Sequence, residues 1–225
     1  MFKGCFGWLH ESWGDIGVLM CPGVGRDAAR SDMSLRLLAV ELARSGYPTL
    51  RFDYPGTGDS CDLDGEEPSA SWLESIGAAA SIVRSTGVRQ IVLCGVRLGS
   101  MLAAIKALEY DDVCAAALVD PVVTGSSYLR ELSIASQLET GAPVGDDGGV
   151  EVDELRLADG PTAPLRAFSL LSMEAPPARH LLVLNSVSPS ALVSKLVDRM
   201  AAILNGRLAA LASRCELGLD VGRRF

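Results

Sequence analysis

The chain has 225 residues, of which 48% are hydrophobic, and its formal net charge at pH 7 is −8. This length and composition allow one sizeable buried core, so we expect a single folded domain over residues 1–225. The acidic balance argues against binding to nucleic acid or to an anionic membrane surface. No stretch approaches about 18 uncharged apolar residues, so the sequence predicts no transmembrane helix.

Cysteine and histidine usage indicates a reduced protein without a metal. The six cysteines are scattered with no C-x-x-C pair, and Cys21, Cys94 and Cys114 fall in predicted strands. Buried thiols of this kind, and an N-terminus without a signal peptide, predict a cytoplasmic protein. Because the only histidines are His10 and His180, we expect no metal site; we also expect no cofactor.

Short apolar segments alternate with helical patterns through the first half of the chain. The expected strands are residues 6–9 (an edge strand), 16–21, 48–53, 90–94 and 115–120. Apolar spacing predicts helices over residues 34–44, 71–85 and 98–109. Such alternation indicates an α/β fold, a mainly parallel sheet covered by helices on both faces. We expect strand 90–94 at its centre, between strands 16–21 and 115–120.

The pattern changes after residue 123. Residues 124–178 read as an insertion with helices at 128–138 and 163–173, followed by a strand at 181–185. A final amphipathic helix is predicted from about 189 to 212. Because no strand is predicted after that helix, we expect a sheet that is incomplete at its C-terminal end. Its exposed edge could be covered by a partner or by a second copy of the chain.

The most informative motif lies between strand 90–94 and helix 98–109. Residues 95–99 read G-V-R-L-G, and a sharp Gly-x-nucleophile-x-Gly turn from strand to helix is typical of a nucleophile elbow. The middle residue is Arg97. A guanidinium stays protonated and cannot attack a carbonyl. The motif therefore predicts the scaffold of acyl chemistry without its nucleophile.

These segments together resemble the α/β-hydrolase superfamily, and within it the serine aminopeptidase-type hydrolases, including those associated with exosortase systems. Residues 51–60, R-F-D-Y-P-G-T-G-D-S, are similar to that branch's f-D-x-x-G-x-G-x-S segment, and residues 21–25 stand where the family has its oxyanion-hole loop. Some exosortase-associated members also carry Arg in the elbow, as G-L-R-L-G. The resemblance covers residues 6–123 well and 124–200 loosely, and it implies that the insertion 124–178 is a lid.

A Ser-His-Asp triad needs an acid after a late strand and a His after the last strand. Residues 185–190 read N-S-V-S-P-S, which contains no acid, and no His follows His180. His180 precedes its strand, so we expect it at the wrong end of the sheet, and His10 at the sheet edge. All three triad positions are expected to be empty. Ser100, one turn into the helix, is the candidate substitute nucleophile.

Arg97 also defines a candidate ligand site. A cation at a helix N-terminus opposes the helix dipole at a cost of about 0.3–1 kcal/mol, so an anion is expected beside it. That anion is either Asp120, at the end of the neighbouring strand, or a carboxylate or phosphate ligand. In the second case the lid and backbone N–H groups of the oxyanion loop would enclose the ligand. The candidate ligand-binding residues are Gly23, Val24, Gly25, Arg97, Leu98 and Asp120.

A second motif overlaps the oxyanion loop. Residues 23–28, G-V-G-R-D-A, match G-x-G-x-x-A between a strand and a helix, and Asp53 ends the next strand. This is the arrangement of a dinucleotide-binding fingerprint. Pro22 is awkward in that pattern, and residues 55–60 have no role in it.

Two functions from different classes stay open. The first is a catalytically degenerate hydrolase fold that binds an anionic small molecule or a protein partner, with homo-oligomerisation an option. The second is a working ester or amide hydrolase or acyl transferase, with an unconventional nucleophile or a site that another chain completes.

Overall fold

The computed structural model describes residues 1–63, 68–140, 149–152, 155–158, 164–186, 191, 193–196 and 208–212. Within these residues the main sheet has seven strands in the order β1-β3-β2-β4-β5-β8-β9. The strands are β1 (Gly7–His10), β2 (Ile16–Cys21), β3 (Thr49–Phe52), β4 (Gln90–Val96), β5 (Val113–Val119), β8 (His180–Asn185) and β9 (Leu208–Ala212). Only β1 is antiparallel to its neighbour. The expected parallel sheet, with β4 between β2 and β5, is confirmed.

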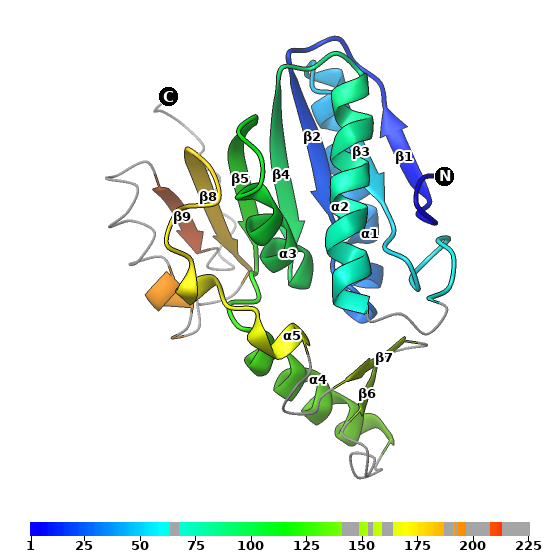
Figure 1. The fold of residues 1–225 in the computed structure, drawn as a ribbon, viewed down its shortest axis with the longest axis vertical. Helices are drawn as coiled ribbons and strands as arrows, with labels where there is room; N and C mark the ends of the chain where they lie inside the picture. Colours follow the sequence, from blue (N-terminus) through cyan, green and yellow to red (C-terminus); the bar gives the residue numbers. More distant parts are fainter. Residues whose placement is uncertain are drawn as a thin grey trace.

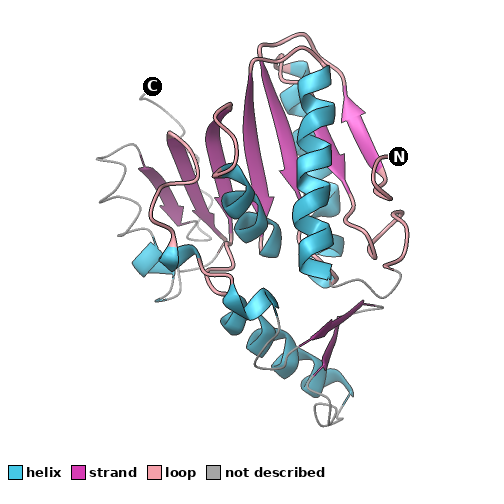
Figure 2. Ribbon diagram, viewed as in Figure 1, coloured by secondary structure: helices cyan, strands magenta, loops and turns pink. Residues whose placement is uncertain are grey.

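Helices cover both faces of this sheet (Figures 1 and 2). They are α1 (Arg26–Arg44), α2 (Pro68–Ser85) and α3 (Leu98–Ala107). In Figure 1, α2 and α3 lie in front of the sheet and α1 lies behind it. Helix α1 begins at Arg26, before the expected residue 34. The first turns were missed because most of their side chains are exposed, and apolar periodicity detects only a buried helix face.

The core divides into one cluster on each face of the sheet. Trp72 and Met101, from α2 and α3, pack with Leu93 on one face. Leu35 from α1 packs with Cys94 on the other face. Neighbouring residues of β4 thus bury their side chains on opposite faces, which is why the strand is apolar throughout rather than alternating.

The insertion between β5 and β8 lies below the carboxyl ends of the strands in Figure 1. It contains α4 (Gly125–Thr140), the antiparallel pair β6 (Gly149–Val152) and β7 (Leu155–Ala158), α5 (Pro164–Ala167) and a 3-10 turn, Leu170–Ser172. The helix expected at 128–138 is confirmed within α4. The single helix expected at 163–173 is wrong, because Ser169 is extended and its Oγ accepts a hydrogen bond from Leu171 N.

The prediction for the C-terminal region is also wrong in part. Residues 191 and 193–196 are helical, but Leu208–Ala212 forms β9 and pairs in parallel with β8. The sheet therefore continues past the point where we expected it to end. Leu and Ala favour helix in isolation, and pairing with the edge of β8 overrides that preference.

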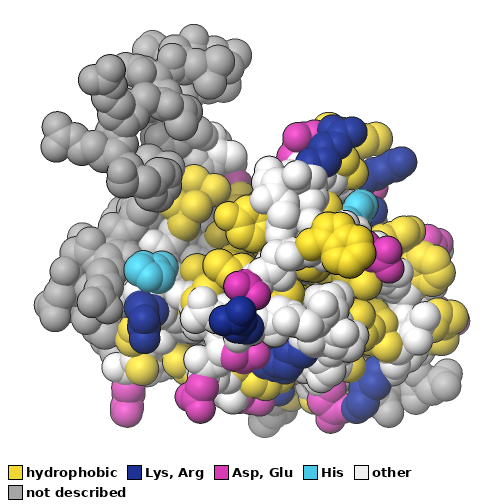
Figure 3. All heavy atoms as spheres, turned by 90° about the horizontal axis from the view of Figure 1, so that it is seen from above, with side chains coloured by type: hydrophobic (Ala, Val, Ile, Leu, Met, Phe, Trp, Pro, Cys, Tyr) yellow, Lys and Arg dark blue, Asp and Glu magenta, His cyan; other side chains and the backbone are white. Residues whose placement is uncertain are grey.

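None of the described helices is both long and apolar enough to cross a membrane. Figure 3 shows the end of the molecule at which the parallel strands begin. Acidic, basic and hydrophobic side chains are intermixed among the described residues that this view shows.

Candidate functional site

Arg97 occupies the apex of the turn between β4 and α3, with φ 52° and ψ −119°. An L-residue held in so sparsely populated a region carries a strain of about 1–3 kcal/mol. The Arg97 N–H donates to the Val119 carbonyl at 2.9 Å, and the Arg97 carbonyl accepts from Ser100 N at 3.0 Å. The sharp backbone of an elbow is thus present although its apex holds no nucleophile.

Two glycines make this turn sterically feasible. A Cβ at Gly95 would lie 2.4 Å from the Cα of Ser100, and one at Gly99 would lie 2.1 Å from the carbonyl oxygen of Pro22. Both distances are far inside van der Waals contact. The second one also shows that the elbow packs directly against the loop between β2 and α1.

The Arg97 guanidinium binds two carboxylates. Its Nε lies 3.0 Å from Asp27 Oδ2 in the first turn of α1, and its NH2 group donates to Glu131 on α4. The side chains of Arg97 and Asp27 are 23% and 21% exposed, whereas Glu131 is 59% exposed. The expected ion pair with Asp120 is wrong. Asp120 Oδ1 instead accepts from Ser186 N at 2.7 Å, across the ends of β5 and β8.

Arg97 is the cation of this cluster. Burial lowers the pKa of Arg97, but the hydrogen bond that Arg97 donates to Glu131 and the charges of Asp27 and Glu131 outweigh burial and raise that pKa overall. Arg97 therefore stays cationic and cannot serve as a general base.

Tyr128 completes the surroundings of Arg97. Its ring centroid lies 5.9 Å from the Arg97 Cζ. The side chain is buried, and among the described residues its hydroxyl has no hydrogen-bond partner. Burial raises the pKa of Tyr128, so the hydroxyl stays protonated. An unsatisfied buried donor costs about 1–3 kcal/mol, which an acceptor on a bound ligand would recover.

Two backbone donors belong to the same end of the sheet. The hydrogen bonds within the described part of the chain include none donated by the N–H of Val24 or Leu98. These residues follow β2 and Arg97, the positions at which an oxyanion hole would have its donors.

Ser100 is placed for a structural role. It is fully buried in α3, and its Oγ donates to the Gly95 carbonyl at 2.6 Å. The same oxygen accepts from Val119 N at 3.1 Å. The hydroxyl therefore joins β4 to β5 and does not face a cavity.

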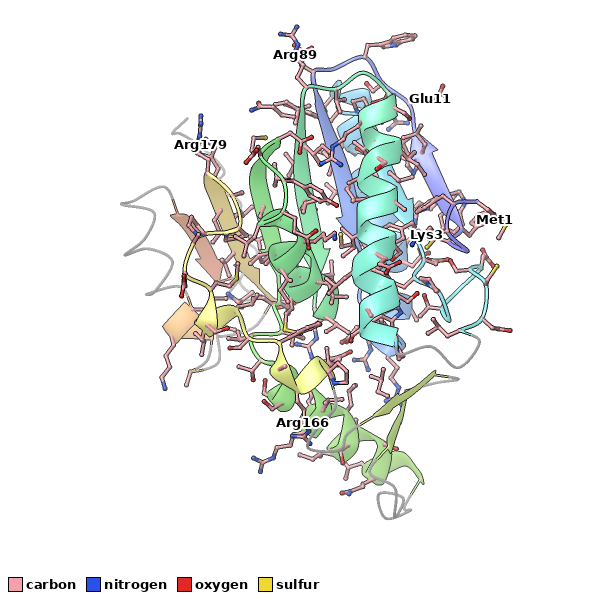
Figure 4. All side chains as sticks on the ribbon, in the orientation of Figure 1. Met1, Lys3, Glu11, Arg89, Arg166 and Arg179 are labelled. Carbon is pink, nitrogen blue, oxygen red and sulfur yellow. The ribbon has the colours of Figure 1, made fainter. Side chains whose placement is uncertain are left out.

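Neither histidine lies at the elbow. His180 is the first residue of β8, and its neighbour Arg179 lies at the opposite end of the sheet from α4 and Arg166 (Figure 4). His10 ends the edge strand β1, and its Nε2 accepts from Arg51 Nε at 3.5 Å. Burial, followed by the charges of Arg51 and Arg36, lowers the pKa of His10.

The candidate ligand residues separate into two places. Gly23 and Gly25 line a cavity of about 790 Å³ between α1, β1, β3 and the loop after β3, and Arg97, Leu98 and Asp120 do not. The cavity lining is Trp8, His10, Met20, Pro22, Gly23, Gly25, Ala28, Ala29, Asp32, Leu35, Arg36, Arg51, Phe52, Asp53, Gly56, Thr57, Gly58 and Asp59.

Sequence reasoning missed three residues that contact Arg97, namely Asp27, Tyr128 and Glu131. Tyr128 and Glu131 are three residues apart, which places them on one face of a predicted helix. Asp27 lies within the G-V-G-R-D-A motif, in the acidic first turn of α1. Each signal exists in the sequence, but none of them specifies Arg97 as the partner.

No protein-family model and no curated protein matches the chain. Solved structures do match it. Est1E from Butyrivibrio proteoclasticus, solved with ferulic acid bound, aligns with a TM-score of 0.66 at 14% identity, over 95% of this chain and 88% of that one. Alpha/beta hydrolase domain-containing protein 10 from mouse aligns with a TM-score of 0.60 at 15% identity, over 93% and 84%. The alpha/beta hydrolase GrgF from Penicillium sp. sh18 aligns with a TM-score of 0.60 at 18% identity, over 92% of this chain and 85% of that one. The chain has the α/β-hydrolase fold.

Proposed function

We propose that this protein is a degenerate α/β hydrolase, related to the serine aminopeptidase-type branch, which binds an anionic ligand at the elbow and does not hydrolyse it. The observation that carries the proposal is the position of Arg97. Arg97 occupies the apex where a nucleophile would stand, and its guanidinium is paired with Asp27 and Glu131.

The surrounding chemistry supports the loss of catalysis. Acyl transfer needs a nucleophile whose proton a nearby base accepts. The chain has two histidines, and they lie at the sheet edge and at the amino end of β8. The hydroxyl of Ser100 is buried and already hydrogen-bonded to Gly95. No described group near the elbow can replace the missing pair.

The same cluster is suited to exchange one carboxylate for another. Glu131 is the more exposed of the two partners of Arg97. A ligand carboxylate or phosphate that replaced Glu131 would gain a charge-assisted contact with Arg97. It would also supply an acceptor for the Tyr128 hydroxyl, which has none among the residues that the structure describes. Asp27 would remain in place and keep the guanidinium oriented.

Hydrolysis is tested with p-nitrophenyl esters and a fluorophosphonate label. The purified protein should give no more turnover than an unrelated control protein, and no single serine should be labelled. Arg97→Ser alone should not restore turnover because no base accompanies the new hydroxyl. Robust hydrolysis by either protein, or label on one serine, would overturn the catalytic half of the proposal.

Anion binding is tested by thermal shift with acetate, phosphate and sulfate on the wild type and two variants. Glu131→Gln removes the competing carboxylate, so it should increase the anion-dependent rise in Tm, whereas Arg97→Ala should abolish that rise. Glu109→Gln, which removes an exposed glutamate paired with Lys106, is the matched control and should behave as the wild type. Equal shifts in the wild type and Arg97→Ala would rule out this site.

The retained elbow favours one second candidate, an ester or amide hydrolase or acyl transferase whose site another chain completes. The strained φ of Arg97 and the unengaged N–H groups of Val24 and Leu98 are features that such an enzyme would keep. Ester turnover that appears only at high protein concentration, or only with a partner added, would support this candidate.

A further inference from the structure

The cavity beside α1 begins next to the elbow, at Pro22, and extends away from it along α1; Arg97 and Leu98 do not line it. Gly25 and Arg36 both line it, and their separation of eleven positions along α1 corresponds to about 16 Å. Asp27, which binds Arg97, does not line it. A volume of about 790 Å³ falls within the range of about 300–1,000 Å³ that is usual for small-molecule sites.

One end of the cavity is built from backbone with small side chains. Gly25 has φ 57° and caps α1 without any side-chain hydrogen bond. A Cβ at Gly23 would lie 2.8 Å from the Cβ of Asp27, so that turn requires glycine. Ala28 follows in the first turn of α1. Gly23, Gly25 and Ala28 are the three small positions of the G-x-G-x-x-A motif, and all three line the cavity.

The carboxylate of Asp53 lies at the carboxyl end of β3, the strand next to β2. Asp53 lines the cavity with the loop residues Gly56 and Asp59. One of its oxygens, Oδ2, accepts from Asp59 N at 3.1 Å. Burial raises the pKa of Asp53. Hydroxyl groups of a ligand could donate hydrogen bonds to this half-buried carboxylate and so replace those that it loses to water on burial.

The rest of the cavity offers an apolar wall and two cations. Trp8 and Leu35 contribute the wall; Phe52 also lines the cavity, but its ring packs against Phe2 and Tyr54 in the core of the opposite face. Arg51 lies 4.9 Å from the Trp8 ring centroid and 3.0 Å from Asp32, so its charge is already paired. Arg36 is exposed at the far end. The lining therefore combines a planar apolar surface, a hydroxyl acceptor and a glycine turn in one groove.

We infer that this cavity binds a ribonucleotide. The phosphates lie at the turn of Gly23 and Gly25, the ribose hydroxyls donate to Asp53, and the base packs against the wall that includes Trp8. The groups stand in the order that a strand–glycine turn–helix unit with an acid on the adjacent strand imposes on a nucleotide. Residues 56–59, which lacked a role in the motif, form the outer wall of the cavity.

The test is calorimetric titration of the full chain with ADP, 2′-deoxy-ADP and inorganic pyrophosphate. We expect one ADP site, with affinity about tenfold weaker for 2′-deoxy-ADP and weaker still for pyrophosphate. No binding of ADP at millimolar concentration to folded protein would overturn the inference. Pyrophosphate bound as tightly as ADP would also overturn it, because ribose and base would then contribute nothing.

Two helix variants locate the site. Ala28→Leu fills the cavity while keeping a strong helix former, so it should weaken ADP binding by about tenfold or more. Ser34→Leu adds the same side chain at an exposed position of α1 outside the cavity, and it should change the affinity by less than about twofold. Equal effects of the two variants would contradict the placement.

A further pair of variants separates this cavity from the elbow. Asp53→Asn should weaken ADP more than 2′-deoxy-ADP, while circular dichroism confirms the fold. Arg97→Ala should abolish the anion-dependent shift at the elbow and leave ADP binding intact. Loss of ADP binding in Arg97→Ala with retention in Ala28→Leu would place the nucleotide at the elbow and overturn the inference.

Discussion

Two strand-to-helix turns of this molecule share one backbone conformation. Gly25, between β2 and α1, has φ 57° and ψ −132°, and Arg97, between β4 and α3, has φ 52° and ψ −119°. Glycine adopts this conformation freely, whereas arginine is strained in it by about 1–3 kcal/mol. The strained conformation is kept at Arg97 although a guanidinium cannot act as a nucleophile. The turn instead directs the Arg97 side chain to Asp27.

The contact between the two turns should give the largest effect on stability. In Gly99→Ala the new Cβ would meet the Pro22 carbonyl at 2.1 Å, and neither backbone can move without disturbing a turn. We expect the free energy of unfolding to fall by about 3 kcal/mol or more. Urea denaturation measures this. A loss under about 1 kcal/mol would show that the two turns are not in rigid contact.

Exchanging the apex residues tests the difference in strain. Gly25→Ala should destabilise the protein by about 1–3 kcal/mol because alanine gains the strain that Arg97 already carries. Arg97→Gly relieves strain and loses two ion pairs, so its unfolding free energy should stay within about 1 kcal/mol of the wild type. The urea unfolding midpoints of Gly25→Ala and Arg97→Gly, each compared with the wild type, measure the two losses. Comparable losses in both variants would mean that the elbow is not strained.

The Asp27–Arg97 ion pair, which joins the two turns, should have a smaller effect on stability. Asp27→Asn removes a partner from a guanidinium that is only 23% exposed, which should cost about 1–2 kcal/mol. Asp32→Asn is the control on the same helix, since Asp32 pairs with Arg51 but is 64% exposed. It should cost less than about 1 kcal/mol. A larger loss of stability in Asp32→Asn than in Asp27→Asn would contradict the conclusion that the Asp27–Arg97 pair is the more buried of the two.

The smallest expected effect concerns the far end of the cavity. Burial, Arg51 and Arg36 lower the pKa of His10 below its usual 6.5. Below pH 6.5 the unfolded chain therefore binds more protons than the folded one, and stability falls as the pH falls through 6.5. His10→Gln should remove under about 0.5 kcal/mol of this acid sensitivity, because solvent screens a half-exposed ring. Urea midpoints at about pH 7.5 and pH 5.5 measure it, and an unchanged pH slope would refute the assignment.

The sequence predicted the centre of the sheet well because β2, β4 and β5 are short apolar runs buried on both faces. The turn at Arg97 was predictable because Gly95 and Gly99 stand at a fixed spacing in the G-V-R-L-G motif; Gly95 is required by the backbone of the same turn and Gly99 by the Pro22 carbonyl of the neighbouring one. The partners of Arg97 were not, since Asp27 is 70 residues and Glu131 34 residues away in the chain. Strand β9 was missed because its Leu and Ala residues favour helix locally. In both cases a tertiary contact overrode the local pattern.

The span of the Asp27–Arg97 pair has a consequence for the order of folding. A contact across 70 residues closes a long loop, and the entropy of that closure is repaid only after β2, α1 and β4 are assembled. We therefore expect the ion pair to be absent from the folding transition state. Substitutions of Asp27 should then accelerate unfolding and leave the refolding rate nearly unchanged, so the Asp27–Arg97 ion pair would prolong the lifetime of the native state.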